Sequence, residues 1–157
     1  MLTFNEKLQS FYERVGYKGA GIALFREEPG NTFSVLLGKR AYNPGKGQWT
    51  FPGGSIEHRE TALHAAWREF YEETRVSLTT LKARYIAEFE LKVPLFYWQT
   101  FIYTTDAHIR FRITHEFSRL GWVKEETFPK LNLHFGVKPI YEYYRKYRNE
   151  VQQKQHR

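Results

Sequence analysis

The chain contains no cysteine, which excludes disulfide bridges and metal sites built on thiolates. It also has no run of 18 apolar residues, so we expect neither a transmembrane helix nor a membrane partner. The first ten residues, MLTFNEKLQS, lack the apolar core that a secretory signal needs. The expected location is therefore the cytoplasm.

The composition is typical of a packed globular protein, because 41% of the residues are hydrophobic and 18% are aromatic. A chain of 157 residues is long enough for a core, and it shows no internal repeat and no interdomain linker. We therefore expect a single domain over residues 1–157. The formal net charge of +7 suits a polyanionic substrate held through a metal. It suits RNA or an anionic surface equally, so charge alone does not choose between them.

Hydrophobic periodicity and turn residues divide the chain into strands and helices. Strands are expected at residues 20–25, 33–40, 83–92, 95–104 and 120–123, and helices at about residues 3–15, 62–74, 125–131 and 137–147. The connections are the turn 28–31, the loop 42–48 and the irregular segment 106–119, and a polar tail follows at 150–157. Strand 95–104 is apolar on both faces, as a central strand is. Strands on both sides of a central helix predict an α/β sandwich.

Three carboxylates, those of Glu69, Glu72 and Glu73, follow directly after Arg68 on the predicted helix 62–74. Each helical residue turns the chain by about 100°, so the three side chains lie within about 100° of arc. Like charges crowded on one face repel each other, and a cation offsets that repulsion. Hard cations such as Mg²⁺ bind carboxylate oxygens, so the cluster is a candidate site for a divalent metal.

The position of these carboxylates around the helix strengthens the metal hypothesis. With Ala62 as the zero angle, an apolar face extends to about 140° and comprises Leu63, Ala66, Trp67 and Phe70. Glu73 falls near 20°, Glu69 near −20° and Glu72 near −80° by the same arithmetic. Two glutamates thus overlap the edge of the buried face, where unpaired carboxylates are seldom found. The alternative is a solvated acidic face.

A short apolar segment, Trp49 to Gly54, leads toward this helix and ends in a proline and two glycines. The two glycines permit a tight turn and a close approach of the backbone to a ligand. Thr61 is a candidate N-cap because its hydroxyl can accept from amides of the first turn. His64 stands where a glutamate would complete a capping box.

Residues 54–76, GSIEHRETALHAAWREFYEETRV, resemble the Nudix box, G-x5-E-x7-R-E-U-x-E-E-x-G-U, in which U is a bulky apolar residue. The matching positions are Gly54, Glu60, Arg68, Glu69, Phe70, Glu72, Glu73 and Val76. The sequence departs from the pattern at Arg75, where the family has glycine. That position follows the helix, where a left-handed conformation is common. A residue other than glycine costs roughly 1 kcal/mol there or re-routes the turn.

This resemblance implies a Nudix-like α/β/α sandwich, with a mixed sheet between helices, and a metal-dependent hydrolase. It implies Mg²⁺ or Mn²⁺ held by Glu69, Glu72 and Glu73, with the Gly53 carbonyl as a fourth ligand. Glu69, Glu72 and Arg68 would be the catalytic residues. One of the glutamates would act as the base, and family members differ on which. Arg68 would orient a carboxylate by a bidentate contact, and Glu60 would support the ligands from behind.

Four residues outside the box are further candidates. Many Nudix proteins add a glutamate from a later loop, and Glu116 stands where that residue occurs, although a surface loop glutamate is the alternative. Its neighbour His115 is interpreted as an ordinary loop histidine. Arg40 ends a strand that leads to the site and is a candidate phosphate ligand, or a surface arginine. Trp49 is a candidate for stacking on a base, with Tyr42 as a second choice, and a place in the core is the alternative.

The resemblance implies cleavage of a phosphoanhydride bond in a nucleoside diphosphate linked to another moiety, such as a nucleoside triphosphate or an ADP-ribose-like nucleotide sugar. One alternative is removal of pyrophosphate from an RNA 5′ end, which the net charge motivates. Another is a non-catalytic nucleotide-sensing or scaffold domain, although such proteins usually lose box carboxylates and this chain keeps them all. The sequence leaves the oligomeric state open, and a homodimer is compatible with it. The basic C-terminal end is expected to be a solvated helix end, and contact with RNA or with an acidic membrane is the alternative; its residues are Arg145, Lys146, Arg148, Lys154 and Arg157.

Overall fold

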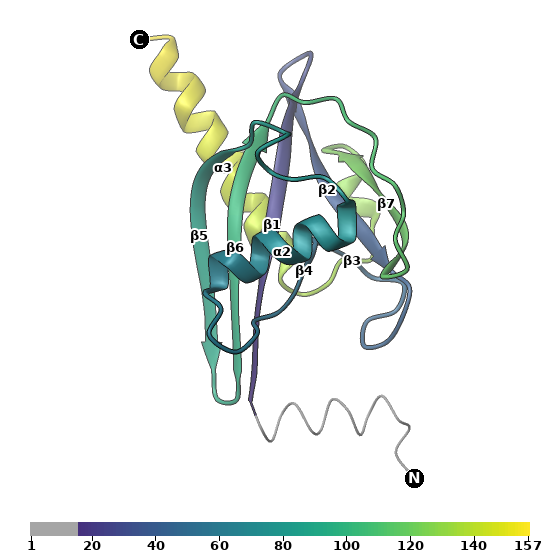
Figure 1. The fold of residues 1–157 in the computed structure, drawn as a ribbon. Coiled ribbons are helices and arrows are strands. Elements are labelled where there is room, and N and C mark those ends of the chain that lie inside the picture. Colours follow the sequence, from purple (N-terminus) through teal and green to yellow (C-terminus); the bar gives the residue numbers. More distant parts are fainter. Residues whose placement is uncertain (1–15) are drawn as a thin grey trace.

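A mixed β-sheet lies between two helices in the computed structural model, which describes residues 16–157 (Figure 1). The central strand order is β3-β2-β1-β6-β5, while β4 pairs with β1 and β7 pairs with β2. The expected α/β/α sandwich is therefore confirmed. The predicted helix at residues 3–15 lies outside the described residues.

The strands are β1 (Tyr17–Glu28), β2 (Thr32–Arg40), β3 (Trp49–Thr50), β4 (Gly53–Ser55), β5 (Arg84–Val93), β6 (Phe96–Thr105) and β7 (Phe117–Lys124). The helices are α2 (Ala62–Thr74), the 3₁₀ helix η1 (Phe128–Lys130) and α3 (Val137–Gln155). None of the helices in residues 16–157 combines the length and the apolar character needed to cross a membrane.

Side chains alternate along the central strands, so the sheet has a core on each face. On one face Ile22 and Leu24 of β1 pack with Phe70 of α2. On the other face Phe25 of β1 packs with Tyr144 of α3, and their rings stack with centroids 3.9 Å apart. The sheet therefore carries α2, with its acidic residues, on the side opposite α3.

The two central strands, β1 and β6, run parallel, whereas the other strand pairs are antiparallel. Their pairing extends from Tyr17 opposite Phe96 to Arg26 opposite Thr105. Strand β6 lies between β1 and β5, which confirms its prediction as a central strand. The long connection between β1 and β6 includes α2, which packs back across the sheet.

The predicted end of the last helix at residue 147, and the polar tail after it, are wrong, because α3 continues to Gln155. A buried side chain explains the difference. Arg148 is only 6% exposed and donates to both oxygens of Glu27, at 3.1 Å and 2.8 Å. The Tyr144 hydroxyl donates to the same carboxylate at 2.8 Å. These contacts attach the helix to the β1–β2 turn.

Other boundaries differ because local sequence carries little information about them. Strand β7 begins at Phe117 rather than at residue 120, and the helix expected at 125–131 is only the 3₁₀ turn η1. The two short strands β3 and β4 were not predicted. The helix at 62–74 is confirmed at both ends.

Candidate functional site

Helix α2 begins and ends at the positions that its sequence indicates. The Thr61 hydroxyl accepts a hydrogen bond from the His64 amide at 3.2 Å, which confirms Thr61 as the N-cap. At the other end Arg75 adopts the left-handed conformation, with φ of 61° and ψ of 19°, and its amide donates to the Tyr71 carbonyl. The chain thus keeps the turn of the family pattern without its glycine.

Two glycines bring β4 between β1 and α2. A Cβ on Gly53 would lie 2.6 Å from the Ala20 carbonyl oxygen, so this position needs glycine for β4 to approach β1. A Cβ on Gly54 would lie 2.5 Å from the carboxyl carbon of Glu69. Gly54 therefore leaves a recess that the Glu69 carboxylate occupies. The backbone thus approaches this carboxylate and β1 closely, and the predicted close approach to a ligand stays a prediction.

The three glutamates of α2 differ in burial in the order that helical geometry predicts. Glu73 is 6% exposed, the Glu69 side chain 17% and the Glu72 side chain 53%. The predicted apolar face is wrong at its edge, since Leu63 and Trp67 are each 39% exposed. The buried face comprises Ala65, Ala66, Phe70, Glu73 and Thr74, so it is centred nearer the glutamates than expected.

Arg68 connects most of the acidic residues at the site. Its Nε and Nη2 each donate to one oxygen of Glu60 at 2.9 Å, a bidentate contact. Its Nη1 donates to Glu69 at 3.0 Å and lies 3.3 Å from Glu72. Its Nη2 also donates to the Ser55 carbonyl at 2.9 Å. Arg68 thus holds Glu69 from one side while Glu60 and β4 hold Arg68.

Ionisation at the site follows from these contacts. The hydrogen bonds from Arg68 lower the pKa of Glu60 to about 2, and they raise the pKa of Arg68 itself. Burial raises the pKa of Glu69, and Arg68 opposes that rise. Glu60 is therefore a fixed negative charge that keeps Arg68 in place.

Glu73 is in the most unusual environment. Its Oε2 accepts a hydrogen bond from the Gly53 amide at 3.0 Å. Burial, with the charges of Glu69 and Glu116, raises the pKa of Glu73 to about 9, although the Gly53 hydrogen bond and Arg40 act in the other direction. Without a cation this carboxyl group holds a proton at neutral pH. The structure shows Gly53 in contact through its amide, and the predicted role of its carbonyl stays a prediction.

The loop before β7 also reaches the site. The Thr114 hydroxyl donates to the Glu73 carbonyl at 3.0 Å, and the Ala41 amide donates to the Glu116 carbonyl at 3.1 Å. The Glu116 carboxylate raises the pKa of both Glu69 and Glu73, so its charge acts on the α2 cluster although its side chain is 54% exposed. Neither Thr114 nor Ser55 was identified from the sequence, since their roles depend on loop packing.

Arg40 and Trp49 have different relations to the acidic cluster. Arg40 lowers the pKa of Glu73, and its Nε donates to the Pro44 carbonyl at 2.7 Å. Trp49 packs against the core on the α3 side of the sheet, as the alternative reading expected. It also lines a cavity of about 310 Å³ with Arg119 and Trp122 of β7 and with Ile113.

Within residues 16–157, no three acidic or histidine side chains lie close enough to enclose a metal ion as they stand. Ion pairs with Arg68 occupy oxygens of Glu69 and Glu72. The donor set nevertheless suits a hard cation. It consists of carboxylate oxygens, and the buried Glu73 has a raised pKa that a nearby cation would lower.

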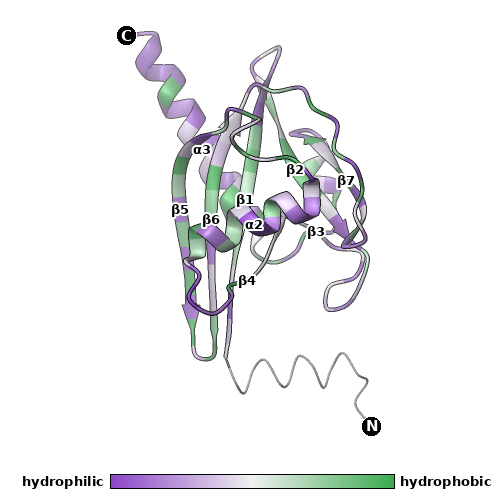
Figure 2. Cartoon of the chain, in the orientation of Figure 1, coloured by the Kyte–Doolittle hydropathy of each residue, from purple (hydrophilic) through white to green (hydrophobic). Residues whose placement is uncertain are grey.

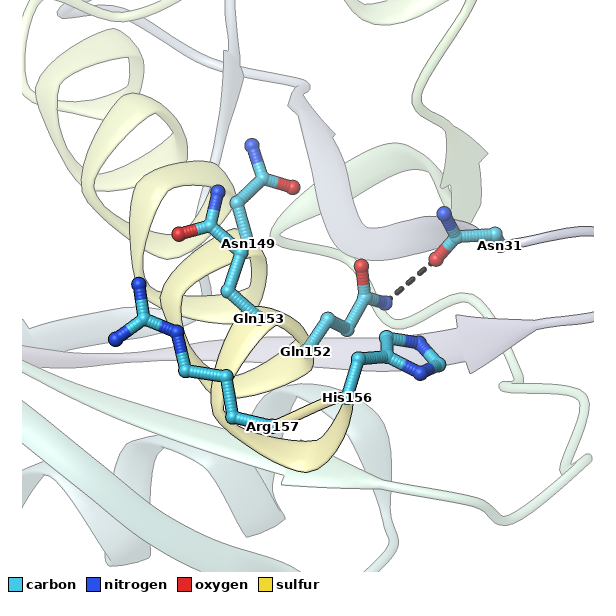
Figure 3. A pocket seen from close by; sticks show the side chains of 6 residues that line it. All are labelled: Asn31, Asn149, Gln152, Gln153, His156 and Arg157. Atoms are coloured by element: carbon cyan, nitrogen blue, oxygen red, sulfur yellow. Dashed lines mark hydrogen bonds between the residues drawn. The ribbon is translucent and has the colours of Figure 1, made fainter.

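Another surface concavity, of about 540 Å³, lies between the end of α3 and the β1–β2 turn (Figure 3). Amide side chains dominate its lining, and Gln152 donates to Asn31 at 2.5 Å. It contains no carboxylate side chain. It therefore lacks the carboxylate ligands for a metal ion that the α2 cluster offers.

Comparison with known proteins identifies a family over most of the chain. The model of the NUDIX domain matches residues 17–144. No curated protein sequence matches the chain.

Many solved structures share the fold. A Nudix hydrolase from M. smegmatis, RenU, is 23% identical with a TM-score of 0.71, and the match covers 86% of this chain and 87% of that chain. An Ap4A hydrolase from C. elegans is 18% identical with a TM-score of 0.70, covering 85% and 98%. A bifunctional NMN adenylyltransferase/ADP ribose pyrophosphatase from Francisella tularensis, complexed with AMP and a Mn ion, is 18% identical with a TM-score of 0.67, covering 87% and 46%.

Proposed function

Since the chain belongs to the Nudix family of hydrolases, which act on phosphoanhydride bonds, we propose that it is a metal-dependent pyrophosphohydrolase of small nucleotides. The observation that carries this proposal is the complete acidic set. Glu73 is buried against the Gly53 amide, and the Glu69 carboxylate fills the recess at Gly54. A sensor or scaffold domain does not require that these carboxylates be kept.

Glu69, Glu72 and Glu73 would hold a divalent cation, Mg²⁺ or Mn²⁺, with the Gly53 carbonyl and Glu116 as further oxygen ligands. Such a cation, when bound, neutralises phosphate charge and lowers the pKa of a water molecule. The Glu69 or Glu72 carboxylate would have to leave its contact with Arg68 in order to bind a cation. The bidentate contact with Glu60 would keep Arg68 in place during this change.

The proton on Glu73 is part of this proposal. The buried carboxyl group must lose it before the group can serve as an anionic ligand. Glu69 is less buried and in contact with Arg68, so it holds a negative charge more readily. Glu69 and Glu72 are the candidates for the base that accepts a proton from the attacking water.

We place the substrate on the loop side of α2. Arg40 would pair with a phosphate group, because it acts electrostatically on Glu73 and is followed by a loop rather than by more sheet. Trp49, with the cavity of about 310 Å³ that it lines, would receive a nucleoside portion by stacking. The preferred substrates are nucleoside triphosphates and compounds like ADP-ribose. Two of the similar structures are named as enzymes of Ap4A and of ADP-ribose, which supports this class.

A substrate panel with Mg²⁺ and with Mn²⁺ tests the proposal, with released phosphate or pyrophosphate as the readout. Glu69→Gln and Glu73→Gln should each lower kcat by about 100-fold, because each replaces an anionic carboxylate ligand of the metal by a neutral amide. Glu142→Gln, an exposed change on α3, should leave the rate unaltered. Absence of turnover on the whole panel, or unchanged rates in both variants, would sink the proposal.

The net charge of +7 favours a second candidate, removal of pyrophosphate from triphosphorylated RNA. The two candidates differ in salt dependence, since RNA binding displaces several counterions and weakens steeply as salt rises. Comparing kcat/KM for triphosphorylated RNA and for free nucleotides across a salt series separates them. A steep fall of kcat/KM for RNA with rising salt, together with a higher kcat/KM for RNA than for free nucleotides, would replace the first candidate by the second.

A further inference from the structure

The end of the β5–β6 hairpin, with the start of β1 beside it, has two unlike faces. On one face polar side chains bond to each other: the Tyr97 hydroxyl donates to Gln99 at 2.8 Å, and Gln99 donates to Glu88 at 3.0 Å. Residues directly opposite on paired strands point to the same side of a sheet. The pairing therefore places on the other face the residues Tyr17, Phe89, Leu91, Val93, Phe96 and Trp98, which we call the aromatic face.

The aromatic face is on the α3 side of the sheet, and α3 reaches one end of it. There Tyr143 lies edge-on to Phe89, with ring centroids 4.7 Å apart. Toward the hairpin turn, Leu91 and Val93 are 41% and 47% exposed, and Leu95 in the turn is 53% exposed. The apolar tip of this hairpin is visible in Figure 2. A contiguous apolar patch of this kind marks an interaction surface.

The rings of the aromatic face are held in position rather than scattered. Tyr17 stacks on Phe96 at 5.8 Å and on Trp98 at 6.4 Å, with interplanar angles of 19° and 10°. Trp98 lies flat over β1 and β4, because a Cβ on Gly21 or on Gly53 would each be 3.1 Å from its Cζ2. Its Nε1 donates to Thr100 at 3.1 Å. The rings thus form a pre-ordered platform.

The described part of the chain begins at the edge of this platform. The Tyr17 amide donates to the Leu95 carbonyl at 2.8 Å, so β1 begins beside the hairpin turn. Gly16 has φ of +83°, a conformation that allows the chain to reverse direction there. The sequence predicts a helix at about residues 3–15 with one apolar stripe, composed of Leu2, Phe4, Leu8, Phe11, Tyr12 and Val15.

We propose that residues 1–15 bind to the aromatic face through this apolar stripe. A helix of that length spans about 20 Å, and the strands of the face, at about 3.3 Å per residue, offer a similar length. The attachment at Gly16 gives the segment an effective concentration in the millimolar range, which favours it over a free partner. The edge strand β5 alternates apolar residues with Glu88, Glu90 and Lys92, and such charges disfavour association of β5 with another sheet edge.

Because the chain has no cysteine, a Ser10→Cys variant can carry a single nitroxide at a position opposite the stripe on the predicted helix. In NMR spectra of isotope-labelled protein, the paramagnetic nitroxide should broaden the amide signals of Leu91, Val93 and Trp98. These signals should sharpen again when the nitroxide is reduced. The signal of Lys154 should be unaffected. Adding Phe11→Asp should remove the broadening, whereas the matched Thr3→Asp, which introduces the same charge on the side of the predicted helix opposite the stripe, should keep it.

A mixture of nitroxide-bearing unlabelled chains with isotope-labelled chains lacking the nitroxide identifies the alternative occupant. Broadening that appears in this mixture as strongly as within one chain means that a second copy covers the face, and it overturns the proposal. Absence of broadening in both samples overturns it as well. The proposal is supported only if the broadening requires the nitroxide and the isotope label in the same chain and is removed by Phe11→Asp.

Discussion

At the residue scale, Glu73 keeps a proton that an ordinary glutamate would lose. Its pKa is raised from 4.5 to about 9 in the folded chain, mainly by burial. Between these two pH values the folded state binds one proton more than the unfolded state. The free energy of unfolding of the metal-free protein should therefore fall as pH rises through this window, by up to about 1.4 kcal/mol per pH unit.

Urea unfolding in the presence of a chelator, from pH 5 to pH 9, measures this dependence. Glu73→Gln, which replaces the carboxyl group by a neutral isostere, should flatten the pH profile above pH 5. Glu72→Gln, at an exposed position of the same helix, should leave the slope unaltered. If Glu73→Gln and the unmodified chain have parallel profiles, the Glu73 carboxyl is not protonated in the fold.

Arg75 shows how a single residue departs from the family pattern while its backbone does not. At φ of 61° a side chain is strained, and glycine is not. We expect Arg75→Gly to raise the free energy of unfolding by about 0.5–1 kcal/mol, measured by urea unfolding. The same change at Arg84, in the extended strand β5, should instead lower it. A destabilised Arg75→Gly variant would mean that the arginine side chain contributes more than its backbone strain costs.

At the element scale, α3 depends on a contact far from it in sequence. Arg148 is buried between Glu27, Asn31 and the ring of Phe33, whose centroid is 5.1 Å from the guanidinium carbon. Arg148→Ala should lower the free energy of unfolding by about 1–3 kcal/mol. The expected loss is below that of a fully buried pair, since Glu27 stays partly hydrated.

Circular dichroism should also show that Arg148→Ala reduces helicity, because the residues after 148 lose their attachment to the β1–β2 turn. Arg145→Ala, an exposed change three residues earlier, should alter stability by no more than about 0.5 kcal/mol. Equal effects of the two substitutions would contradict the role given to the Glu27 contact.

The contrast between α2 and α3 shows how much the sequence could predict. Helix α2 has a threonine cap, an apolar periodicity and a spaced set of carboxylates, so its bounds and the relative burial of its glutamates followed from local rules. The extension of α3 depends on the contact of Arg148 with Glu27, and no local sequence pattern near residue 148 indicates that contact. The strands β3 and β4 could not be predicted from the sequence either. Pairing with distant strands defines them, and neither is long enough to show a hydrophobic periodicity.

The same contrast holds within the candidate site. Arg68, Glu60 and the α2 glutamates came from spacing along one segment, and the structure joins them in one network. Thr114 meets Glu73 only through the path of a loop, so no local pattern could reveal it. The exposure of Leu63 and Trp67 was missed because the tilt of α2 on the sheet depends on all its neighbours.

At the scale of the whole molecule, a bound cation should stabilise the fold. A ligand present at 100 times its Kd adds about 2.7 kcal/mol to the free energy of unfolding. We expect Mn²⁺ to raise Tm, and to do so more at pH 8 than at pH 6, because Glu73 must release its proton on binding. Glu73→Gln should greatly reduce the rise, and Glu142→Gln should retain it. A rise that persists unchanged in Glu73→Gln would place the cation elsewhere.

The parallel pairing of β1 with β6 also governs when the molecule can assemble. Tyr17 and Phe96 face each other across a long stretch of intervening chain, and α2 lies within that stretch. Bringing the two strands together costs the entropy of closing this large loop before their contacts form. Folding should therefore be slow compared with that of helical bundles of this size. During synthesis, a ribosome must release the whole of β6 before β1 gains its parallel neighbour.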